Sequence, residues 1–296
     1  METQGLLEQL KDGVQAFRSG ARWQEFLDTA ARFHHYSFRN QVLIWAQYPE
    51  ATHVAGYQTW RNEFGQQVKK GEHGIAILAP MIAKRTERDA NGEERTREAL
   101  IGFRPVHVFD LAQTEAQDTE QARATRATLE APVVAELVGD AGADLLARLE
   151  RVAHDAGLTL SRADTGRANG YAMAGGSIVL STANSPSQDA KTLAHEIAHH
   201  WLGHIERPEE MAKIAAGAGI DAHHLAEFEA ESAAYLVSKA LGLNADGYSF
   251  GYLAVWTAGL DRDALDALFV HCGGRVQGVA QRMIAAAEHL DVARAA

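Results

Sequence analysis

The segment from Ser185 to Gly203 constrains the fold more than any other part of the chain, because it carries the start and stop signals of one helix. Ser185 is a favoured N-cap residue, Pro186 is tolerated in a first helical turn, and Gln188 completes an S-x-x-Q capping box. Gly203 can adopt the left-handed conformation that ends a helix. An apolar stripe predicts that one side of this helix is buried; it consists of Leu193, Ile197 and Trp201.

The same helix contains the HExxH pattern His195-Glu196-Ile197-Ala198-His199. Residues four apart lie on one face of a helix, so both imidazoles can ligate one zinc ion while Glu196 accepts a proton from a water molecule. The bare pattern arises by chance in roughly one chain in twenty of this composition, so the helix signals carry part of the argument. We expect a zinc site with Glu196 as its catalytic base.

A catalytic zinc site needs a third protein ligand. One known arrangement requires glycine at 202 and histidine at 205, where this chain has Leu202 and Ile205, so that register fails. The helical segment 226–237 instead places Glu227 and Glu231 four apart on one face. We expect Glu227 to ligate zinc and Glu231 to orient a ligating histidine by accepting its second N–H, although the sequence also allows the two roles to be exchanged.

Other reactive side chains in this region are expected to have supporting roles. The histidines interpreted as surface groups or as supports of the ligands are His200, His204, His223 and His224. Cys272, the single cysteine, is expected to be a small buried apolar residue. One cysteine excludes an intrachain disulfide and is typical of a reducing cytoplasm. The chain also lacks an apolar run of membrane-spanning length and an N-terminal signal peptide, so we expect a cytoplasmic protein without a membrane partner.

Hydrophobic periodicity predicts a mixed architecture. The N-terminal part is expected to contain helices at 5–17 and 23–33, and strands at 74–80 and 99–109 around a turn at Asn91-Gly92. The C-terminal part is expected to contain a helix at 132–156, strands at 158–161 and 177–181, and helices after Pro186. We therefore expect an α+β chain of two domains: residues 1–125, with a linker at 113–130, and a mainly helical domain at 131–296 with a small antiparallel sheet. Strand 177–181 is expected to be the edge to which an extended substrate adds.

Charge and aromatic residues distinguish the two parts. Basic and acidic residues balance up to residue 110, so the net charge of −11 falls entirely after it. Aromatic and basic side chains alternate in the N-terminal part, a mixture that suits single-stranded DNA but also a packed core with a solvated face. The candidate DNA-binding residues are Arg39, Asn40, Gln41, Tyr57, Trp60, Arg61, Lys69 and Lys70.

Several of these motifs together resemble one family. HEIAHH with EFEAESAAYLV is similar to the zincin-like C-terminal domain of ArdC-type antirestriction proteins. YSFRNQVLIWAQ, GYQTWRNEFGQQVKKGEHGIAIL and VFDLAQTE resemble the single-stranded-DNA-binding N-terminal domain of the same family. Related zincins usually carry Asp where this chain has Glu231. The longer Glu side chain changes the carboxylate that is expected to orient a ligating histidine.

The resemblance implies a single-stranded-DNA-binding zinc metalloendopeptidase of a mobile genetic element. Such a protein would protect incoming DNA from restriction, cleave DNA-associated protein substrates, or do both. Two alternatives differ in class. One is a non-enzymatic DNA-binding antirestriction factor with a structural zincin domain, and the other is a regulatory protease of the ImmA/IrrE kind.

Overall fold

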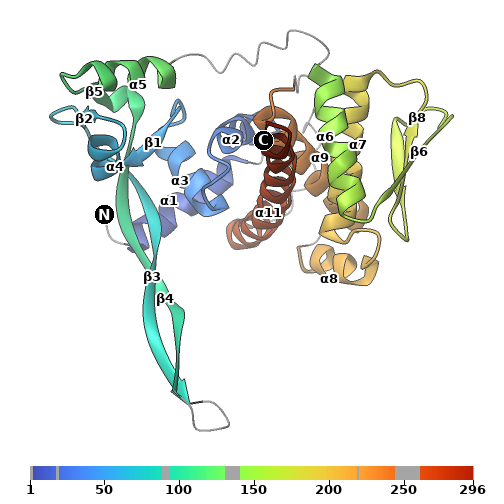
Figure 1. Cartoon of the computed structure of the whole chain (residues 1–296). Helices are drawn as coiled ribbons and strands as arrows, with labels where there is room; N and C mark the ends of the chain where they lie inside the picture. Colours follow the sequence, from blue (N-terminus) through green and yellow to red (C-terminus); the bar gives the residue numbers. More distant parts are fainter. Residues whose placement is uncertain are drawn as a thin grey trace. The chain divides into compact units, whose positions relative to one another are not determined.

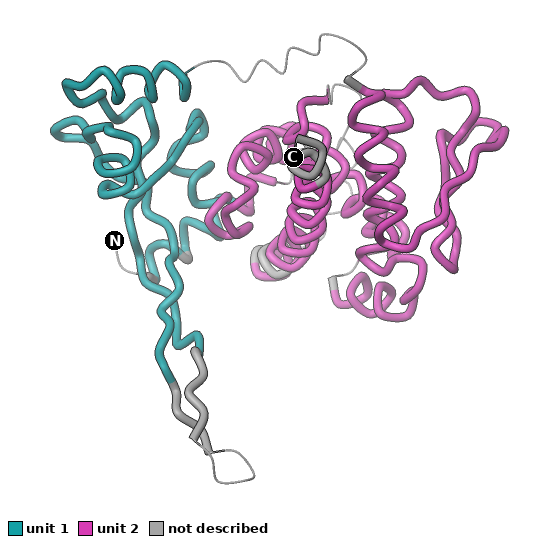
Figure 2. Tube along the Cα trace, viewed as in Figure 1, with its two compact units in different colours: residues 1–13, 42–131 teal, residues 14–41, 132–296 magenta. Residues whose placement is uncertain are grey.

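The computed structural model describes residues 3–17, 20–88, 94–130, 141–218, 220–243 and 261–295. The predicted turn at Asn91-Gly92 and the start of the predicted helix at 132 lie outside these ranges. The chain divides into two compact units, coloured separately in Figure 2. Unit 1 comprises residues 1–13 and 42–131, and unit 2 comprises residues 14–41 and 132–296.

Unit 1 combines helices with short strands and one long hairpin (Figure 1). Its helical elements are α1 (Thr3–Ala16), α3 (Phe38–Gln47), α4 (Tyr57–Asn62), the 3-10 turn η1 (Leu111–Gln113) and α5 (Glu120–Glu130). Its strands are β1 (Val54–Gly56), β2 (Gln66–Val68), β3 (Ile75–Arg88), β4 (Glu94–Asp110) and β5 (Thr114–Ala116). Helices α1 and α3 contribute residues to both units.

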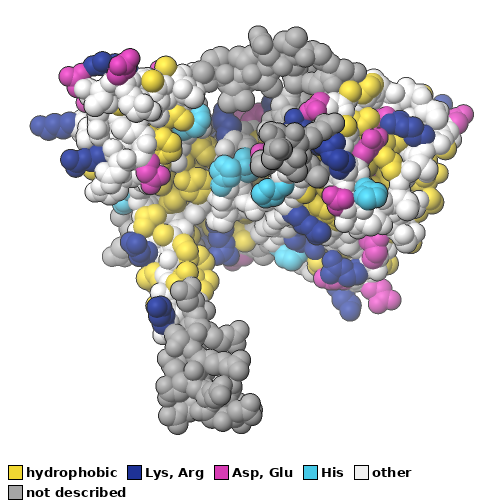
Figure 3. Space-filling model, viewed as in Figure 1, with side chains coloured by type: hydrophobic (Ala, Val, Ile, Leu, Met, Phe, Trp, Pro, Cys, Tyr) yellow, Lys and Arg dark blue, Asp and Glu magenta, His cyan; other side chains and the backbone are white. Residues whose placement is uncertain are grey.

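The β3–β4 hairpin is longer than the sequence predicts. Strand β3 continues through Pro80, which pairs with Phe103, instead of ending there. The sheet order β1-β4-β3 makes β3 an outer strand, where the missing N–H of a proline is tolerated. Apolar side chains on the hairpin reach solvent, as the yellow patch in Figure 3 shows; the large exposed ones are Ile82, Leu100, Ile101 and Phe103.

Residues 113–130, predicted to be a linker, are folded into unit 1. Strand β5 pairs with β2 in an antiparallel register. Helix α5 is fixed to both strands, because Gln66 Nε2 donates to the Ala122 carbonyl at 2.9 Å and Arg126 donates to the Thr114 carbonyl at 2.9 Å. The polar composition of this segment therefore reflects a solvated helix face and not a connector.

Unit 2 is mainly helical, as predicted. Its helices are α2 (Gly20–Arg32), α6 (Ala141–Asp155), α7 (Pro186–Leu202), α8 (Pro208–Ala218), α9 (Ala222–Ala240) and α11 (Arg262–Ala295). Its strands are β6 (Thr159–Ala163), β7 (Gly170–Met173) and β8 (Ser177–Ser181). No helix in the described ranges combines the length and apolar character needed to cross a bilayer.

The small sheet of unit 2 is mixed, not antiparallel. Strand β8 lies in its centre, parallel to β6 and antiparallel to β7. The prediction that residues 177–181 form the edge strand is therefore wrong. The outer strands are β6 and β7, and the sequence did not reveal β7. The run Ile178-Val179-Leu180 is buried, as expected for a central strand.

An aromatic cluster holds α2 in unit 2. The Trp23 ring lies 4.8 Å from Phe17, 5.1 Å from Phe228 and 5.2 Å from Phe269, measured between centroids. Its indole N–H donates to Ser232 Oγ at 3.1 Å. Because these contacts join α2 to α9 and α11, the compact unit differs from the predicted domain of residues 1–125, which would include α2.

Candidate functional site

Helix α7 begins and ends where the sequence predicts. The Ser185 side chain accepts a hydrogen bond from the Gln188 backbone N–H at 3.3 Å, and Pro186 stands in the first turn. Gly203 ends the helix at a φ of 78°, in the left-handed region. The capping box is incomplete, because the Gln188 amide donates to Thr192 Oγ1 at 3.1 Å and does not return to the N-cap.

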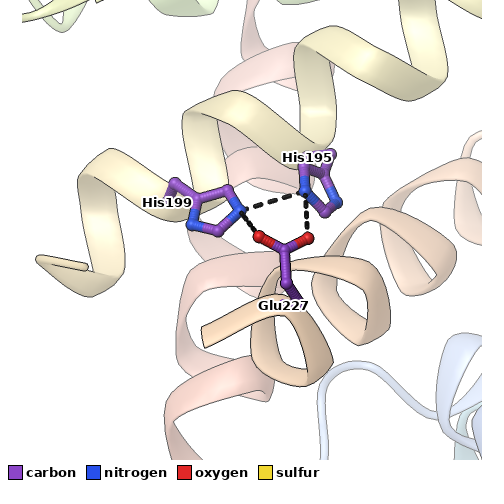
Figure 4. A group of neighbouring side chains, drawn as sticks. All are labelled: His195, His199 and Glu227. Carbon is purple, nitrogen blue, oxygen red and sulfur yellow. Dashed lines mark hydrogen bonds and ion pairs between the residues drawn. The ribbon is translucent and has the colours of Figure 1, made fainter. Parts of the chain in front are cut away.

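The three predicted metal ligands converge, two from α7 and one from α9 (Figure 4). His195 Nε2 and His199 Nε2 lie 3.0 Å apart. Each is 3.4 Å from one carboxylate oxygen of Glu227. Two imidazoles and one carboxylate within 4.8 Å of one another fit a divalent metal ion, which His195, His199 and Glu227 would hold.

Glu231 occupies the other side of the first imidazole. One of its carboxylate oxygens lies 3.2 Å from His195 Nδ1. A carboxylate in this position accepts the second N–H of a ligating histidine and fixes its tautomer. The geometry thus favours Glu227 as the ligand and Glu231 as the group that orients His195.

The three residues shift one another's pKa values. Burial by itself would lower the pKa of His195, but hydrogen bonds to Glu227 and Glu231 raise it to about 10. Burial and the neighbouring charge of His195 lower the pKa of His199 to about 3. The hydrogen bond from His195 lowers the pKa of Glu227 to about 2, although burial opposes this shift. At neutral pH these shifts favour a protonated His195 beside an ionised Glu227.

Glu196 faces the cavities next to the histidines. Its side chain is buried, and burial raises its pKa. A cavity of about 330 Å³ and another of about 520 Å³ both have His195 and Glu196 in their walls. A buried carboxylate with a raised pKa beside a cavity suits general-base chemistry.

Strand β7 forms a wall of both cavities. Gly170 lines both of them, and Tyr171 and Ala172 line the larger one. The backbone of Gly170 lies close against α7, because a Cβ at this position would stand 2.7 Å from Thr192 Cγ2. This outer strand therefore runs beside the HExxH residues, where a substrate chain could add.

The remaining histidines of the region differ in environment. His223 and His224 are exposed, and His200 pairs with Glu206 at 2.7 Å. His204 is buried, with its Nδ1 2.9 Å from His199 Nδ1 and its Nε2 3.0 Å from Glu229.

Two residues behind His204 were not found by sequence reasoning. Arg275 Nε and Nη2 donate to the two oxygens of Glu229 at 2.8 and 3.1 Å. Burial raises the pKa of Glu229, but the hydrogen bonds from His204 and Arg275 outweigh it and lower the pKa overall. Because Arg275 is 46 residues away in α11, no local pattern could reveal this pair.

The structure separates the candidate DNA-binding residues into exposed and buried sets. Arg39 in unit 2 and Arg61, Lys69, Lys70 and Tyr57 in unit 1 are exposed. The buried ones are Asn40, Gln41 and Trp60.

Two of the buried side chains have structural partners. The Gln41 amide donates to the Phe33 carbonyl at 3.0 Å, and the Trp60 indole N–H donates to the Phe109 carbonyl at 2.7 Å. With 1% of its surface exposed, Trp60 cannot stack on a base in this conformation.

A hollow of about 460 Å³ in unit 1 brings together three of the exposed candidates, Tyr57, Lys69 and Lys70. It is lined by Tyr57, Gln67, Val68, Lys69, Lys70, Glu72, Phe109 and Glu115. The Lys69 ammonium donates to the Ala112 carbonyl at 2.8 Å, and Tyr57 packs edge-on to Phe109. Phe109, assigned only to a strand by the sequence, thus supplies a second aromatic ring beside two lysines.

Residues 2–109 match the family model of the N-terminal domain of anti-restriction factor ArdC. The fold agrees with a crystal structure of the antirestriction ArdC protein from the R388 plasmid, described as metal-free, at a TM-score of 0.52 and 21% identity over 86% of each chain. Residues 2–109 therefore belong to the ArdC N-terminal domain family. The predicted resemblance to ArdC-type proteins is confirmed for this part of the chain.

One further protein and a second crystal structure of the R388 protein also resemble this chain. An uncharacterized protein of Bacillus anthracis is 25% identical over 285 residues, which covers 86% of this chain but only 46% of the relative. The chain thus spans about half the length of the curated relative it matches. A Mn(II)-bound crystal structure of the R388 protein has a TM-score of 0.49 at 19% identity, over 84% of this chain and 85% of that one.

Proposed function

We propose that this ArdC-type chain is a metal-dependent endopeptidase that acts on proteins associated with single-stranded DNA, with zinc as its metal. The observation that carries the proposal is the convergence of His195, His199 and Glu227 beside the buried carboxylate of Glu196. A site that only stabilised the fold would have no use for a general base facing a cavity.

The chain's own residues divide the work of hydrolysis. A divalent metal ion held by His195, His199 and Glu227 would supply a Lewis acid for the peptide carbonyl and for a water molecule. Glu196 accepts the proton of that water and then delivers it to the leaving amine. Glu231 keeps His195 in the tautomer that presents Nε2 to the metal.

The substrate chain would bind along β7. This strand lies at the outside of its sheet and passes the larger cavity with Tyr171 and Ala172. Pairing with its backbone would hold an extended peptide across Glu196, as in other cases of strand addition. We also propose that unit 2 is a zincin-like domain.

The hollow of unit 1 supports a role for DNA. Lys69 and Lys70 can neutralise phosphates, and Tyr57 and Phe109 can contact bases. Together with the ArdC N-terminal match, this favours single-stranded DNA that recruits the protein to its substrates. Protection of incoming mobile-element DNA from restriction is the biological role we propose.

The test is a cleavage assay on the full-length protein. Casein and the protein itself are offered as substrates, with Zn(II), with Mn(II) or with chelator, and with or without single-stranded DNA. We expect metal-dependent cleavage that is lost in Glu196→Gln. If Glu196→Gln still protects DNA from restriction while no condition gives cleavage, the non-enzymatic antirestriction factor replaces the peptidase.

A further inference from the structure

The end of α7 brings a third histidine against a metal ligand. The left-handed turn at Gly203 folds the chain back, so that the His204 backbone N–H donates to the His199 carbonyl at 3.0 Å. The same turn brings His204 Nδ1 to 2.9 Å from His199 Nδ1, with the rings edge-on at a centroid distance of 4.9 Å. His204 is thus aimed at the nitrogen of His199 that does not face Glu227.

Hydrogen-bond chemistry gives this contact a direction. The ionised carboxylate of Glu229 can only accept, so His204 Nε2, 3.0 Å away, must carry the proton. In neutral His204 the Nδ1 atom is then an acceptor, and it receives the Nδ1–H of His199. His199 is left with its lone pair on Nε2, the atom that faces the metal position.

The far end of the chain of hydrogen bonds is fixed by a buried ion pair. The Glu229 side chain is fully buried, and Arg275 binds both of its oxygens. Arg275 also donates to the Leu202 carbonyl at 2.9 Å, in the last turn of α7. A buried ion pair is costly to desolvate, and apolar side chains in its place could stabilise the fold equally well. The stability of the fold alone therefore does not account for the pair of Glu229 and Arg275.

We propose that His204, Glu229 and Arg275 form a positioning relay that holds His199 in the tautomer and orientation required to ligate a divalent metal. The proposal rests on the proposed metal site and extends it. The two histidine ligands are then oriented differently: His195 directly by the carboxylate of Glu231, and His199 through an intervening imidazole. All three relay residues are positioning residues, because none reaches the metal position.

The experiment measures metal affinity of the full-length protein by competition with a chromophoric chelator, using Zn(II) and Co(II). We expect His204→Ala to weaken binding about 10- to 100-fold, the usual effect of losing a group behind a ligand. His204→Gln should recover most of the affinity, because its amide can accept from His199 and donate to Glu229. His200→Ala is the matched control, since this histidine in the last turn of α7 pairs with Glu206 instead.

A second measurement does not depend on how the variants fold. Nitrogen-15 NMR of the wild-type, metal-free protein should find the His199 proton on Nδ1. A proton on Nε2, or His204→Ala that folds and binds metal as tightly as wild type, would overturn the relay. Wild-type protein that binds metal through the relay but cleaves nothing would contradict only the proposed peptidase activity.

Discussion

The Nε2 atoms of His195 and His199 lie 3.0 Å apart, because both side chains leave the same face of α7. A proton on either atom would make this contact a hydrogen bond. The opposed pKa shifts, to about 10 for His195 and about 3 for His199, assign that proton to His195. At neutral pH a metal ion that binds here would therefore displace a proton from His195.

This proton makes metal binding dependent on pH. Below the pKa of about 10, His195 is protonated, whereas the pKa of about 2 leaves Glu227 ionised throughout the neutral range. Binding therefore releases about one proton, and the apparent affinity should rise about tenfold per pH unit between pH 7 and 9. Calorimetry in buffers of different ionisation enthalpy measures the release. Affinity that does not change over this range would contradict the protonated state of His195.

The two candidate carboxylates should separate in a metal-content assay. Glu227→Ala removes a ligand and should leave the purified protein without stoichiometric metal. Glu231→Ala removes only the acceptor behind His195 and should retain the metal with affinity reduced about 10- to 100-fold. Glu210→Ala, a change at an exposed carboxylate of α8, is the control. Full metal in Glu227→Ala together with its loss in Glu231→Ala would exchange the two assignments.

Glu196→Gln should bind metal and unfold like wild type but hydrolyse peptides at least about 100-fold more slowly, because an amide cannot accept the proton of water. The change is close to isosteric, so the cavities beside the residue should persist. Metal analysis and a thermal melt check integrity, and the cleavage rate gives the result. A rate equal to that of wild type would exclude Glu196 as the base.

The start of α7 offers a test of the fold that supports the site. Ser185→Ala removes the hydrogen bond to the Gln188 backbone N–H and should lower the free energy of unfolding of this part by about 1 kcal/mol. Ser185→Asp should retain most of the stability, since its carboxylate can cap the same N–H. Urea unfolding followed by circular dichroism compares the three proteins, and equal stability of Ser185→Ala would show that the cap contributes little.

Local signals in the sequence predicted α7 well, because its caps and the spacing of its histidines involve residues within four positions of one another. Long-range contacts were out of reach for the same reason. The outer strand β7 has no alternation strong enough to predict it, and its place depends on pairing with β8. Arg275 meets Glu229 only through packing of α11 on α9.

The sequence also did not show which aromatic side chains are buried and which are exposed. Trp60 and Tyr57 are three residues apart in one sequence motif, yet one is buried and the other exposed. Which side of a short helix faces the core is decided by the strands it covers, and here the Phe109 carbonyl binds the Trp60 indole N–H. Trp60→Ala should therefore destabilise unit 1 instead of removing a base-stacking platform.

Binding of single-stranded DNA should depend on the unit 1 hollow. Lys69→Glu with Lys70→Glu should weaken binding by the full-length protein and reduce the slope of log affinity against log salt by about 2, because each lysine that contacts a phosphate releases counterions. Tyr57→Ala should weaken binding without changing that slope, since stacking releases no ions. Arg22→Glu with Lys213→Glu, two exposed positions of unit 2, makes the same change in net charge and is the control. Fluorescence anisotropy over a salt series, with duplex DNA as competitor, measures both quantities. Equal losses in the lysine pair and in the control would mean that overall charge, and not the hollow, governs binding.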